Sequence, residues 1–589
     1  MRYFFSFFMF FLSLTAWGQS EVFDRAYNSK TKTLDFEPYA EVFGTPENCS
    51  PAALAALEDC RLTKKVHRLL LHNRTYRFRP DGLRPYMTYI SNNGAYERCF
   101  AFDLTGLRHL EIDGGGALLL FHGYVCPFHV CKAEDIELRN LRIDYDRTFH
   151  SEGHIVGISP EYIDLKFSPE YPYRIDEERL HMVDEEGTEY PWFYLLEFNP
   201  KRLETEWKVN DQWTGNSLKA IDLGNRTVRL MHPNLMGTVG NLMNLGMAER
   251  RVPAITVSDS KRVSLHDITI YHAGGMGVIA QRSRDLLLER LVVEPAPGKD
   301  RVVSAAADAT HFVNCSGYIR MYDCRMLCQT DDATNIHGVY YRIAELAQPN
   351  RLIVELANDA QRGFDYLKKG MQIEFVCSNN LQTYAHAKIK DAHAINTELT
   401  RFEVNLENNI PEDAKPMDVI AGCSEYPEVH IRGCYFGQNR ARGLLLGSRA
   451  KMLIEDCTFH NGGPALLMEG DARYWFEQAG VRDVTIRNNL FDNCYYGHWG
   501  TGVISVGTGL DRDKWPECRY NQNVKVLNNT FRLIQQPVMD LYCLKGLTLR
   551  GNRFVMSHDY PNNINISEPE RLIRATDCDD LDLHEIILE

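Results

Sequence analysis

Two adjacent aspartates, Asp331 and Asp332, lie in the polar segment Cys328–Asn335 (CQTDDATN), and Asp308 precedes Asp331 by 23 residues. Neighbouring carboxylates raise one another's pKa, because each disfavours the ionisation of the next. A set that keeps one carboxyl protonated while another is ionised can perform general acid and general base catalysis. An isolated Asp-Asp pair is more often a polar turn. The acid/base interpretation therefore requires a fold that brings Asp308 beside the pair.

Short segments that alternate polar and apolar residues recur along most of the chain. They include VSLHDITI from Val263, LLLERLVV from Leu286, VHIRGCYF from Val429, MLIEDCTF from Met452, VKVLNNTF from Val524 and LTLRGNRF from Leu547. Where such segments follow one another directly the step is 23 residues, as for Leu265 and Leu288, Ile431 and Ile454, and Val526 and Leu549. A fixed period of this size, made of strands and polar corners, predicts an all-β fold, a parallel β-helix or solenoid. A β-sandwich is the alternative, but it does not predict a constant step.

Two longer intervals interrupt the repeat: 127 residues separate Leu138 from Leu265, and 110 separate Met321 from Ile431. Each contains strand-like segments of its own, so we expect two small inserted β-domains, barrel-like in form. The second begins directly after the Asp-Asp segment, where it would help to form the walls of a pocket. The predicted organisation is a signal peptide at 1–18, an N-terminal cap and first coils at 19–143, an inserted β-domain at 144–256, central coils with the aspartates at 257–338, a second inserted β-domain at 339–426 and C-terminal coils at 427–589.

The first eighty residues predict an export signal followed by a cap. Met1-Arg2 precedes the apolar segment 3–14, and small residues up to Gly18 suit cleavage after that residue. We therefore expect an exported protein, periplasmic or secreted. Ser50-Pro51 predicts a helix N-terminus, with Ser50 as the N-cap and the helix running to Leu62, and residues 66–78 predict a strand. Such a helix would cover the open end of the solenoid.

Composition limits the classes of partner and cofactor. A net charge of −14 and a pI near 5.8 argue against nucleic acid as a partner. After the N-terminal segment, no stretch is apolar enough to span a membrane. The 16 cysteines lack the density of a disulfide framework, and we expect the recurrent ones to be small apolar core residues: Cys315, Cys324, Cys328, Cys434 and Cys457. The sequence contains no Cys-x-x-Cys or His-Glu-x-x-His motif, so we expect no metal and no other cofactor.

The repeat also predicts where the carboxylates lie. Asp331 and Asp332 lie ten and eleven residues after Met321 in the preceding strand. When the extra loop 294–303 is set aside, Asp308 lies at nearly the same distance after Leu288. On the next coil, the same distances counted from Ile431 lead to Ala441 and Arg442. Parallel strands lie about 4.8 Å apart, so carboxylates on neighbouring coils would be roughly 5–9 Å apart. That range suits glycoside hydrolysis, in which one carboxyl protonates the leaving oxygen and another activates water or attacks. A separation near the upper end favours inversion.

The signal peptide, the helical cap, the 23-residue period and the aspartates on neighbouring coils together resemble the pectin-lyase-like right-handed β-helix enzymes. Within that group, segment 308–338 (DATHFVNCSGYIRMYDCRMLCQTDDATNIHG) is similar to glycoside hydrolase family 110, the exported bacterial exo-α-1,3-galactosidases. The resemblance implies an inverting hydrolase that releases terminal α-1,3-linked galactose from oligosaccharides or glycoconjugates, of the blood-group B type or with linear Galα1,3Gal. It implies that Asp308, Asp331 and Asp332 are catalytic. It further implies that Asp331 is the general acid, while Asp308 and Asp332 hold and deprotonate the water.

Further residues and other functions stay open. His311, Asn335 and Arg442 are candidate substrate-binding residues, although each could instead pair with a neighbouring polar group. Four tryptophans could stack on a sugar or fill a core: Trp192, Trp213, Trp475 and Trp499. The alternative functions are another polysaccharide-degrading β-helix enzyme, either a polygalacturonase-like hydrolase or a lyase, and a non-catalytic glycan-binding solenoid. The sequence does not decide which galactoside is preferred, or whether the chain is a monomer or a homodimer.

Overall fold

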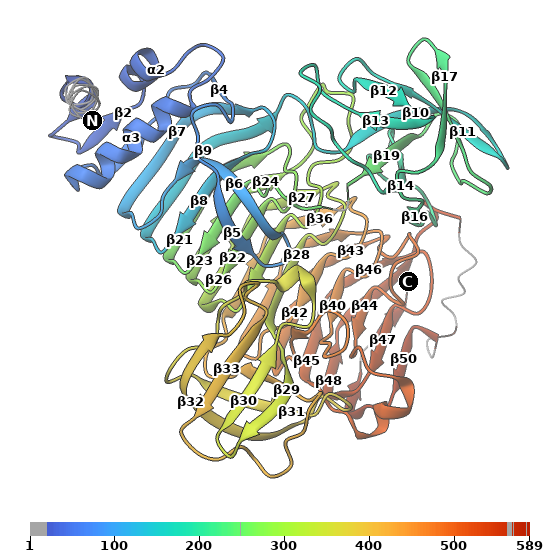
Figure 1. The fold of residues 1–589 in the computed structure, drawn as a ribbon. Helices are drawn as coiled ribbons and strands as arrows, with labels where there is room; N and C mark the ends of the chain where they lie inside the picture. Colours follow the sequence, from blue (N-terminus) through green and yellow to red (C-terminus); the bar gives the residue numbers. More distant parts are fainter. Residues whose placement is uncertain (1–20, 248, 562–567, 569–570, 585, 589) are drawn as a thin grey trace.

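The computed structural model describes residues 21–247, 249–561, 568, 571–584 and 586–588. The predicted signal peptide lies outside these residues. The described chain forms a parallel β-helix whose coils stack from the N-terminal to the C-terminal end, with two antiparallel β-domains projecting from it (Figure 1). Within the same residues, no helix is long and apolar enough to cross a membrane.

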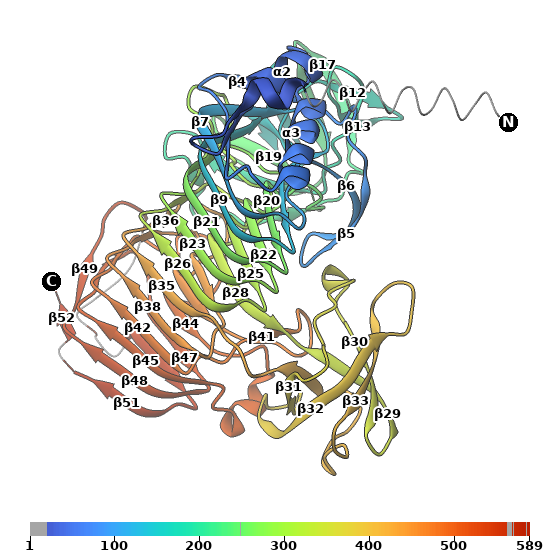
Figure 2. The same ribbon diagram turned by 90° about the vertical axis from the view of Figure 1, so that its left-hand side faces the viewer.

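One long sheet of the β-helix carries two ladders of parallel strands (Figure 2). The first ladder comprises β7 (Arg108–Phe121), β9 (Glu134–Tyr145), β21 (Lys261–Ile270), β23 (Arg284–Glu289), β26 (Ser316–Tyr322), β35 (Glu428–Arg432), β38 (Lys451–Glu455), β42 (Asp483–Arg487), β45 (Asn521–Leu527), β48 (Leu544–Arg550) and β51 (Asp579–Leu583). The second comprises β24 (Val292–Val293), β27 (Arg325–Leu327), β36 (Tyr435–Gly437), β39 (Thr458–His460), β43 (Leu490–Asp492), β46 (Thr530–Leu533), β49 (Asn552–Met556) and β52 (Ile586–Leu588).

The register of the first ladder follows the 23-residue period. Its Cα partners include Leu265 with Leu288, Ile431 with Ile454, and Val526 with Leu549. Leu138 is also the partner of Leu265, and Met321 is the partner of Ile431. Each long interval in the repeat is therefore an excursion of the chain that returns to the next coil.

The second sheet forms another wall of the β-helix and carries the aspartates at its edge. Its strands are parallel from β6 to β50, and β5 adds an antiparallel hairpin at the N-terminal end. They are β5 (Tyr86–Ile90), β6 (Gly94–Asp103), β8 (Val125–Cys131), β20 (Ile255–Ser258), β22 (Val278–Gln281), β25 (Thr310–Val313), β28 (Thr334–Val339), β37 (Leu444–Leu446), β40 (Leu466–Met468), β44 (Ile504–Val506), β47 (Met539–Tyr542) and β50 (Ile573–Thr576).

A left-handed backbone conformation recurs at one corner of the coils. The residue two positions after each paired apolar residue of the first ladder has a positive φ: Asp267, Arg290, Asp323, Gly433, Asp456, Asn488, Asn528 and Gly551. Asn, Asp and Gly adopt this conformation more easily than other residues do. The corner geometry therefore explains why these residue types recur in the repeat.

The interior is built from columns of like side chains. Phenylalanines on five successive coils stack with ring centroids 4.6–5.4 Å apart: Phe436, Phe459, Phe491, Phe531 and Phe554. The cysteines expected in the core are all buried free thiols: Cys315, Cys324, Cys328, Cys434 and Cys457. Burial of apolar surface along these columns is the main force that holds the coils together.

The N-terminal end is covered by two helices, α2 (Glu37–Phe43) and α3 (Ser50–Thr63). Two details of the prediction were wrong here. Ser50 is the first helical residue and Cys49 is the N-cap; the Ser50 hydroxyl donates to the carbonyl of Arg79 (2.7 Å). Residues 66–78 form two strands, β3 (Arg68–Leu70) and β4 (Thr75–Phe78), because the chain turns between them.

The two long intervals form separate antiparallel domains. The first is a ten-stranded sheet made of β10 (Ser151–Ser159), β11 (Tyr162–Phe167), β12 (Tyr173–Asp176), β13 (Arg179–Met182), β14 (Tyr194–Asn199), β15 (Glu204–Thr205), β16 (Gln212–Trp213), β17 (Lys219–Gly224), β18 (Thr227–Met231) and β19 (Leu242–Gly246). The second is a closed barrel of β29 (Tyr341–Gln348), β30 (Arg351–Glu355), β31 (Gln372–Val376), β32 (Thr383–Ala394), β33 (Arg401–Leu406) and β34 (Val419–Gly422). The second domain follows β28 directly in the chain, whereas the first lies between β9 and β20 (Figure 1).

Candidate active site

Asp331 and Asp332 lie at a corner of their coil, immediately before β28. The corner includes Cys328, which has a φ of +61°, and neither aspartate belongs to the strand. The alternation that sends consecutive strand residues to opposite faces therefore does not separate them. One carboxylate oxygen from each of Asp308, Asp331 and Asp332 lies within 4.8 Å of the others. This spacing is shorter than the roughly 5–9 Å expected from the strand geometry.

Asp308 stands beside Asp332 in the ladder, and not beside Asp331. The backbone N–H of Ala309 donates to the carbonyl of Asp332 at 3.0 Å, in the same register that pairs β25 with β28. On the next coil, the N–H of Ala333 donates to the carbonyl of Arg442, also at 3.0 Å. These contacts place Asp308, the Asp-Asp pair and Arg442 on three successive coils, with Asp308 one residue away from its expected register.

Three arginines surround Asp331. Arg250 Nη2 donates to Asp331 Oδ2 at 2.6 Å, and Arg440 Nη1 lies 3.5 Å from Asp331 Oδ1. Arg442 donates from Nε to Asp332 Oδ1 at 2.7 Å, and its Nη2 lies 4.0 Å from Asp331 Oδ1. The positive charge is therefore concentrated on the Asp331 side of the set.

This arrangement distributes protons unequally among the three carboxyls. Burial and the neighbouring charge of Asp331 raise the pKa of Asp308 to about 8. Burial likewise raises the pKa of Asp332 to about 8, although Arg442 opposes the change. Burial also acts on Asp331, but the three arginines more than offset it and the pKa of this carboxyl is lowered. At neutral pH the negative charge of the set is therefore held mainly on Asp331.

A cavity of about 560 Å³ opens above Asp331. Its walls come from four parts of the chain: the β5–β6 hairpin, the first inserted domain, the short helix η1 (Asp359–Gln361) of the second and a loop of the C-terminal coils. The side chain of Asp331 is 16% exposed and lines the cavity, whereas those of Asp308 and Asp332 are 3% and 1% exposed and lie behind it. Other lining residues include Asn92, Tyr96, Tyr194, Trp213, Arg250, Arg440, Arg442 and Trp475.

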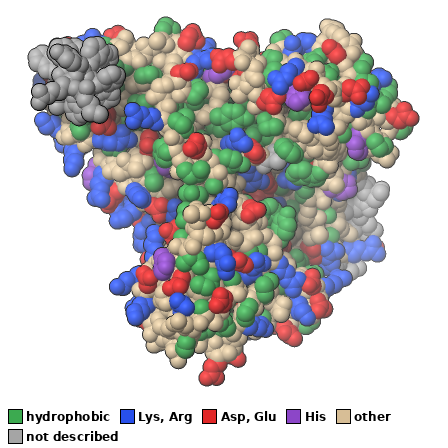
Figure 3. Space-filling view, in the orientation of Figure 1, with side chains coloured by type: hydrophobic (Ala, Val, Ile, Leu, Met, Phe, Trp, Pro, Cys, Tyr) green, Lys and Arg blue, Asp and Glu red, His purple; other side chains and the backbone are tan. Residues whose placement is uncertain are grey.

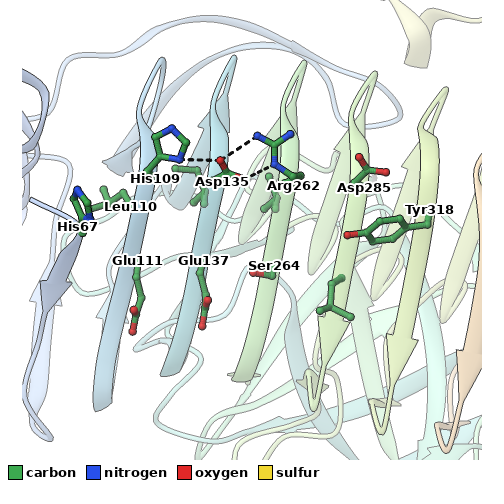
Figure 4. Close-up of a pocket in the computed structure, with 13 residues that line it drawn as sticks. His67, His109, Leu110, Glu111, Asp135, Glu137, Arg262, Ser264, Asp285 and Tyr318 are labelled. Carbon is green, nitrogen blue, oxygen red and sulfur yellow. Dashed lines mark hydrogen bonds and ion pairs between the residues drawn. The ribbon is translucent and has the colours of Figure 1, made fainter. Parts of the chain in front are cut away.

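A second hollow, of about 400 Å³, lies on the outer face of the long sheet (Figure 4). Its polar side chains come from successive strands and pair with one another, as Asp135 does with His109 (2.8 Å) and with Arg262. Acidic and basic side chains are similarly interspersed over the face of the molecule in Figure 3. None of the three candidate catalytic aspartates lines this hollow, so we do not assign the active site to it.

The structure separates the three candidate substrate-binding residues. Arg442 lines the cavity. His311 and Asn335 are Cα partners on β25 and β28, both are buried, and neither lines the cavity. His311 lies behind the set, where its Nδ1 is 2.6 Å from Asp308 Oδ2.

The four candidate tryptophans have different surroundings. Trp213 and Trp475 line the cavity and are 66% and 47% exposed. Trp499 donates from Nε1 to Asp211 (3.2 Å), which also pairs with Arg440. Trp192 is in the core of the first inserted domain, with 2% of its surface exposed. Trp213 and Trp475 are thus the two in position to meet a sugar.

Several site residues were missed by sequence reasoning: Arg250, Arg440, His337 and Glu477. Arg440 and His337 lie two residues from Arg442 and Asn335, so an extended reading of the repeat could have found them. Arg250 follows the first inserted domain, and Glu477 belongs to the short strand β41 (Glu477–Gln478), which pairs with β28. Neither segment has a register that the repeat predicts.

The carboxylate spacing is close enough for three oxygens to share a cation. However, Arg250, Arg440 and Arg442 already supply positive charge at this position. We therefore assign the charge compensation to the arginines, and the expectation that no metal takes part stays a prediction.

Comparisons with known proteins agree with the fold and identify relatives. Family models match residues 151–242 (GLAA-B beta-barrel domain I), 351–420 (GLAA-B beta-barrel domain II) and 419–564 (right handed beta helix region). The solved exopolygalacturonase of family 28 from Yersinia enterocolitica is 11% identical, with a TM-score of 0.42, over 93% of this chain and 78% of that one.

Curated relatives match over most of the chain. Alpha-1,3-galactosidase A of Shewanella woodyi is 32% identical over 91% of this chain and 88% of the relative. Alpha-1,3-galactosidase B of Bacteroides thetaiotaomicron is 28% identical over 78% and 75%, and alpha-1,3-galactosidase A of Bacteroides fragilis is 27% identical over 91% and 89%. With both inserted domains and the β-helix matched, the chain belongs to the family of α-1,3-galactosidases A and B.

Proposed function

We propose that the protein is an exo-acting glycoside hydrolase that releases terminal α-1,3-linked galactose from glycans. The observation that carries the proposal is the set of three carboxylates within 4.8 Å of one another, of which Asp331 lines a walled cavity and the other two lie directly behind it. Walls on several sides admit the end of a glycan more readily than its middle, which supports exo action. The names of the relatives support galactose as the released sugar and α-1,3 as the linkage.

We assign the role of general acid to Asp331, because it is the carboxyl of the three that lines the cavity and can reach a glycosidic oxygen. Asp308 and Asp332 stand beside one another behind it, so they can hold a water molecule and accept its proton. The cavity-lining arginines Arg250 and Arg442 would donate hydrogen bonds to the hydroxyls of the bound sugar.

The charge pattern of the free site requires a shift of one proton before reaction. Asp331 is ionised in the free site, whereas a general acid must carry a proton. Transfer of a proton from Asp308 or Asp332 to Asp331 produces the reactive form without changing the number of protons on the set. Hydroxyls that share the hydrogen bonds of Arg250 would weaken its hold on Asp331 and favour this shift. The apparent pKa values of a pH–rate profile then belong to the whole set and not to one residue.

We propose inversion of the anomeric configuration, on the basis of the family resemblance and of the paired carboxyls Asp308 and Asp332. The distance between carboxylates does not itself support inversion, because about 6.5–9.5 Å is usual for inverting enzymes and the nearest oxygens here are within 4.8 Å. The water must therefore be held by the Asp308–Asp332 pair and not on a line between the acid and a single distant base.

The experiment that tests the function is incubation of the full-length protein with linear Galα1,3Gal and with a fucosylated blood-group B trisaccharide. Free galactose should appear from at least one of them, and from neither an α-1,4- nor an α-1,6-linked galactoside at a comparable rate. Release of an unsaturated product that absorbs in the ultraviolet would indicate a lyase instead. Tight binding without any released sugar would indicate a glycan-binding solenoid.

We also propose that the protein is exported, because residues 1–18 have the pattern of a signal peptide. Expression of the full-length chain with a C-terminal tag in a bacterial host tests this proposal. A mature N-terminus following Gly18, in the periplasm or the medium, is the expected result. An uncleaved chain in the cytoplasm would contradict it.

A further inference from the structure

A continuous line of short polar contacts leads away from Asp308 into the β-helix. Asp308 Oδ2 is 2.6 Å from His311 Nδ1, and His311 Nε2 is 2.8 Å from His337 Nε2. His337 Nδ1 is 2.8 Å from the carbonyl oxygen of Gly338. The two imidazole rings meet edge to face, with centroids 4.9 Å apart, and all three side chains are buried.

The number of protons in this line follows from its chemistry. A carbonyl oxygen accepts but does not donate, so His337 Nδ1 must carry a hydrogen. The His311–His337 contact joins two ring nitrogens and requires one hydrogen between them, and the Asp308–His311 contact requires another. The line therefore holds three protons, whereas a carboxylate and two neutral imidazoles hold two. Asp308, His311 and His337 together carry one proton more than an ionised Asp308 would, and their net charge is zero.

The additional proton can occupy either end of the line. With neutral imidazoles, His337 Nε2 accepts from His311 Nε2–H, so His311 Nδ1 accepts and Asp308 must be the donor. Burial raises the pKa of Asp308 to about 8 and lowers that of His311 well below its usual range, which favours this arrangement at rest. At the other end, Glu477 Oε1 lies 3.5 Å from His337 Nε2 and would stabilise an imidazolium there.

Several other polar and charged groups of the described residues face this line. Asn92 Nδ2 is 3.4 Å from Glu477 Oε1 and 3.5 Å from His311 Nε2, which is too long to fix the tautomer of the ring. Arg250, Asp331 and Glu477 act electrostatically on both Asp308 and His311, and Arg442 also acts on Asp308. Glu477 is therefore the acidic group at the far end that can compensate a positive charge on His337.

We propose that His311 and His337 are positioning residues that move a proton from Asp308 toward Glu477, so that a buried, protonated Asp308 becomes the carboxylate that accepts a proton from water. This inference rests on the proposed function. In the shift, the Asp308 proton passes to His311 Nδ1 as the His311 Nε2 proton passes to His337 Nε2. Asp308 is left ionised, His311 is neutral in its other tautomer, and His337 is an imidazolium.

The protons and electrons of the reaction then balance. Water forms a bond to the anomeric carbon and gives one proton to Asp308, while Asp331 gives its proton to the leaving oxygen as the glycosidic bond breaks. Because the proton of Asp308 moves into the line, Asp331 receives its proton from Asp332 before reaction. After reaction the line holds one proton too many and Asp332 one too few, so transfer of that proton through solvent to Asp332 restores the resting state, in which Asp331 is ionised. No oxidant, metal or other reactant is needed.

The pH profile of His337→Phe tests the proposal, since phenylalanine keeps the ring but removes both nitrogens. Without His337 the proton of Asp308 must leave to solvent before reaction. The acid limb of kcat/KM should therefore move up toward the pKa of Asp308, and the ratio of kcat/KM at pH 8 to that at pH 6 should rise at least about tenfold. A merely structural effect would lower the rate equally at both pH values, and that result would overturn the proposal.

A matched control lies in the same column of the same sheet. His129 on β8 is three coils before His311, through Thr256 and Ile279, and its Nδ1 contacts Thr256 Oγ1 at 2.6 Å. His129→Gln should leave the pH ratio unchanged, and an equal shift in this variant would also overturn the proposal. If thermal melting shows that His337→Phe is misfolded, His337→Gln replaces it with the same expected shift.

A nitrogen-15 NMR measurement on histidine-labelled wild-type protein separates this inference from the proposed function. At pH 7 the His337 ring, assigned by its loss in the variant, should be neutral with its hydrogen on Nδ1. A hydrogen on Nε2 with Nδ1 bare would overturn the relay even if galactose is released. Conversely, a protein that releases no galactose but shows this tautomer would refute the proposed function and leave the proton count intact.

Discussion

Arg442 Nε donates to Asp332 Oδ1 at 2.7 Å, although 110 residues separate these two side chains in the sequence. The backbone N–H of Arg442 contacts the same oxygen at 3.2 Å. The second inserted domain lies between the two coils in the sequence, yet the ladder continues across it without a break. The geometry of the site therefore depends on which residues of neighbouring coils are paired with one another.

Asp331→Asn and Asp332→Asn should each lower kcat by about 10²–10⁴-fold, because each removes a group that gives or accepts a proton in the reaction. Both changes keep the shape of the side chain, so the circular dichroism spectrum should stay that of the wild type. Asp259→Asn, a change at a half-buried salt bridge with Arg282 outside the cavity, is the control and should keep its turnover. Wild-type kcat in either site variant would remove that residue from the acid/base set.

Arg250→Gln should raise the pKa of Asp331, because the guanidinium at 2.6 Å holds this carboxyl ionised. The acid limb of kcat/KM against pH should then move to higher pH by about one unit. Arg282→Gln removes a half-buried guanidinium paired with Asp259 (2.8 Å) and should not move the limb. A limb that stays in place in Arg250→Gln would show that Asp331 does not govern the profile.

Asp308→Asn should make the protein more stable than the wild type at high pH. The pKa of Asp308 is raised to about 8, so folding binds a proton at this group between about pH 4 and pH 8, and the wild type loses stability as the pH rises through that window. Asparagine does not titrate and can still donate to His311 Nδ1. The melting temperature of the variant should exceed that of the wild type by roughly 1–3 °C above pH 8, with no difference near pH 4.

Asp259→Asn is the control for these melting experiments, because its effect on stability should depend on pH in the opposite direction. Arg282 holds the pKa of Asp259 below its usual value despite burial, so this carboxylate stabilises the protein at neutral pH and the benefit is lost as the pH falls through its lowered pKa. The variant should melt below the wild type at pH 7 and approach it at low pH. A stability difference for Asp308→Asn that does not change with pH would contradict its raised pKa.

Trp213→Ala and Trp475→Ala should weaken the binding of oligosaccharides. Both rings line the cavity and are well exposed, so they can stack on the sugar that follows the terminal galactose. KM for a trisaccharide should rise about 3–20-fold, while KM for a small chromogenic α-galactoside stays nearly constant. Trp515, outside the cavity, is the control position. An equal rise for both substrates would place the rings at the galactose itself.

The β-helix could be predicted from sequence because its pattern repeats. A partner such as Leu288 for Leu265 follows from the period alone, and the corners at Asp267 and Asn528 follow from the need for a left-handed backbone. The same period brought Asp308, Asp331 and Asp332 together on neighbouring coils. It erred by one residue at Asp308, because the coil before β25 is irregular.

The parts outside the repeat could not be predicted in this way. Arg250 and Glu477 reach the site from segments whose position depends on how the inserted domain and a C-terminal loop pack. His311 illustrates a different limit, because its type and spacing suit either a sugar or a carboxylate. Its actual partners, Asp308 and His337, are determined by side-chain directions within the coil.

The decisive experiment is proton NMR of the methyl β-glycoside of Galα1,3Gal during the first minutes of hydrolysis, with wild type and Asp331→Asn side by side. In this substrate the terminal sugar is the only one released as free galactose. The wild type should release galactose that is first seen as the β-anomer, and Asp331→Asn should release none over the same period. Galactose released first as the α-anomer, or released by the variant at the wild-type rate, would contradict the proposed mechanism.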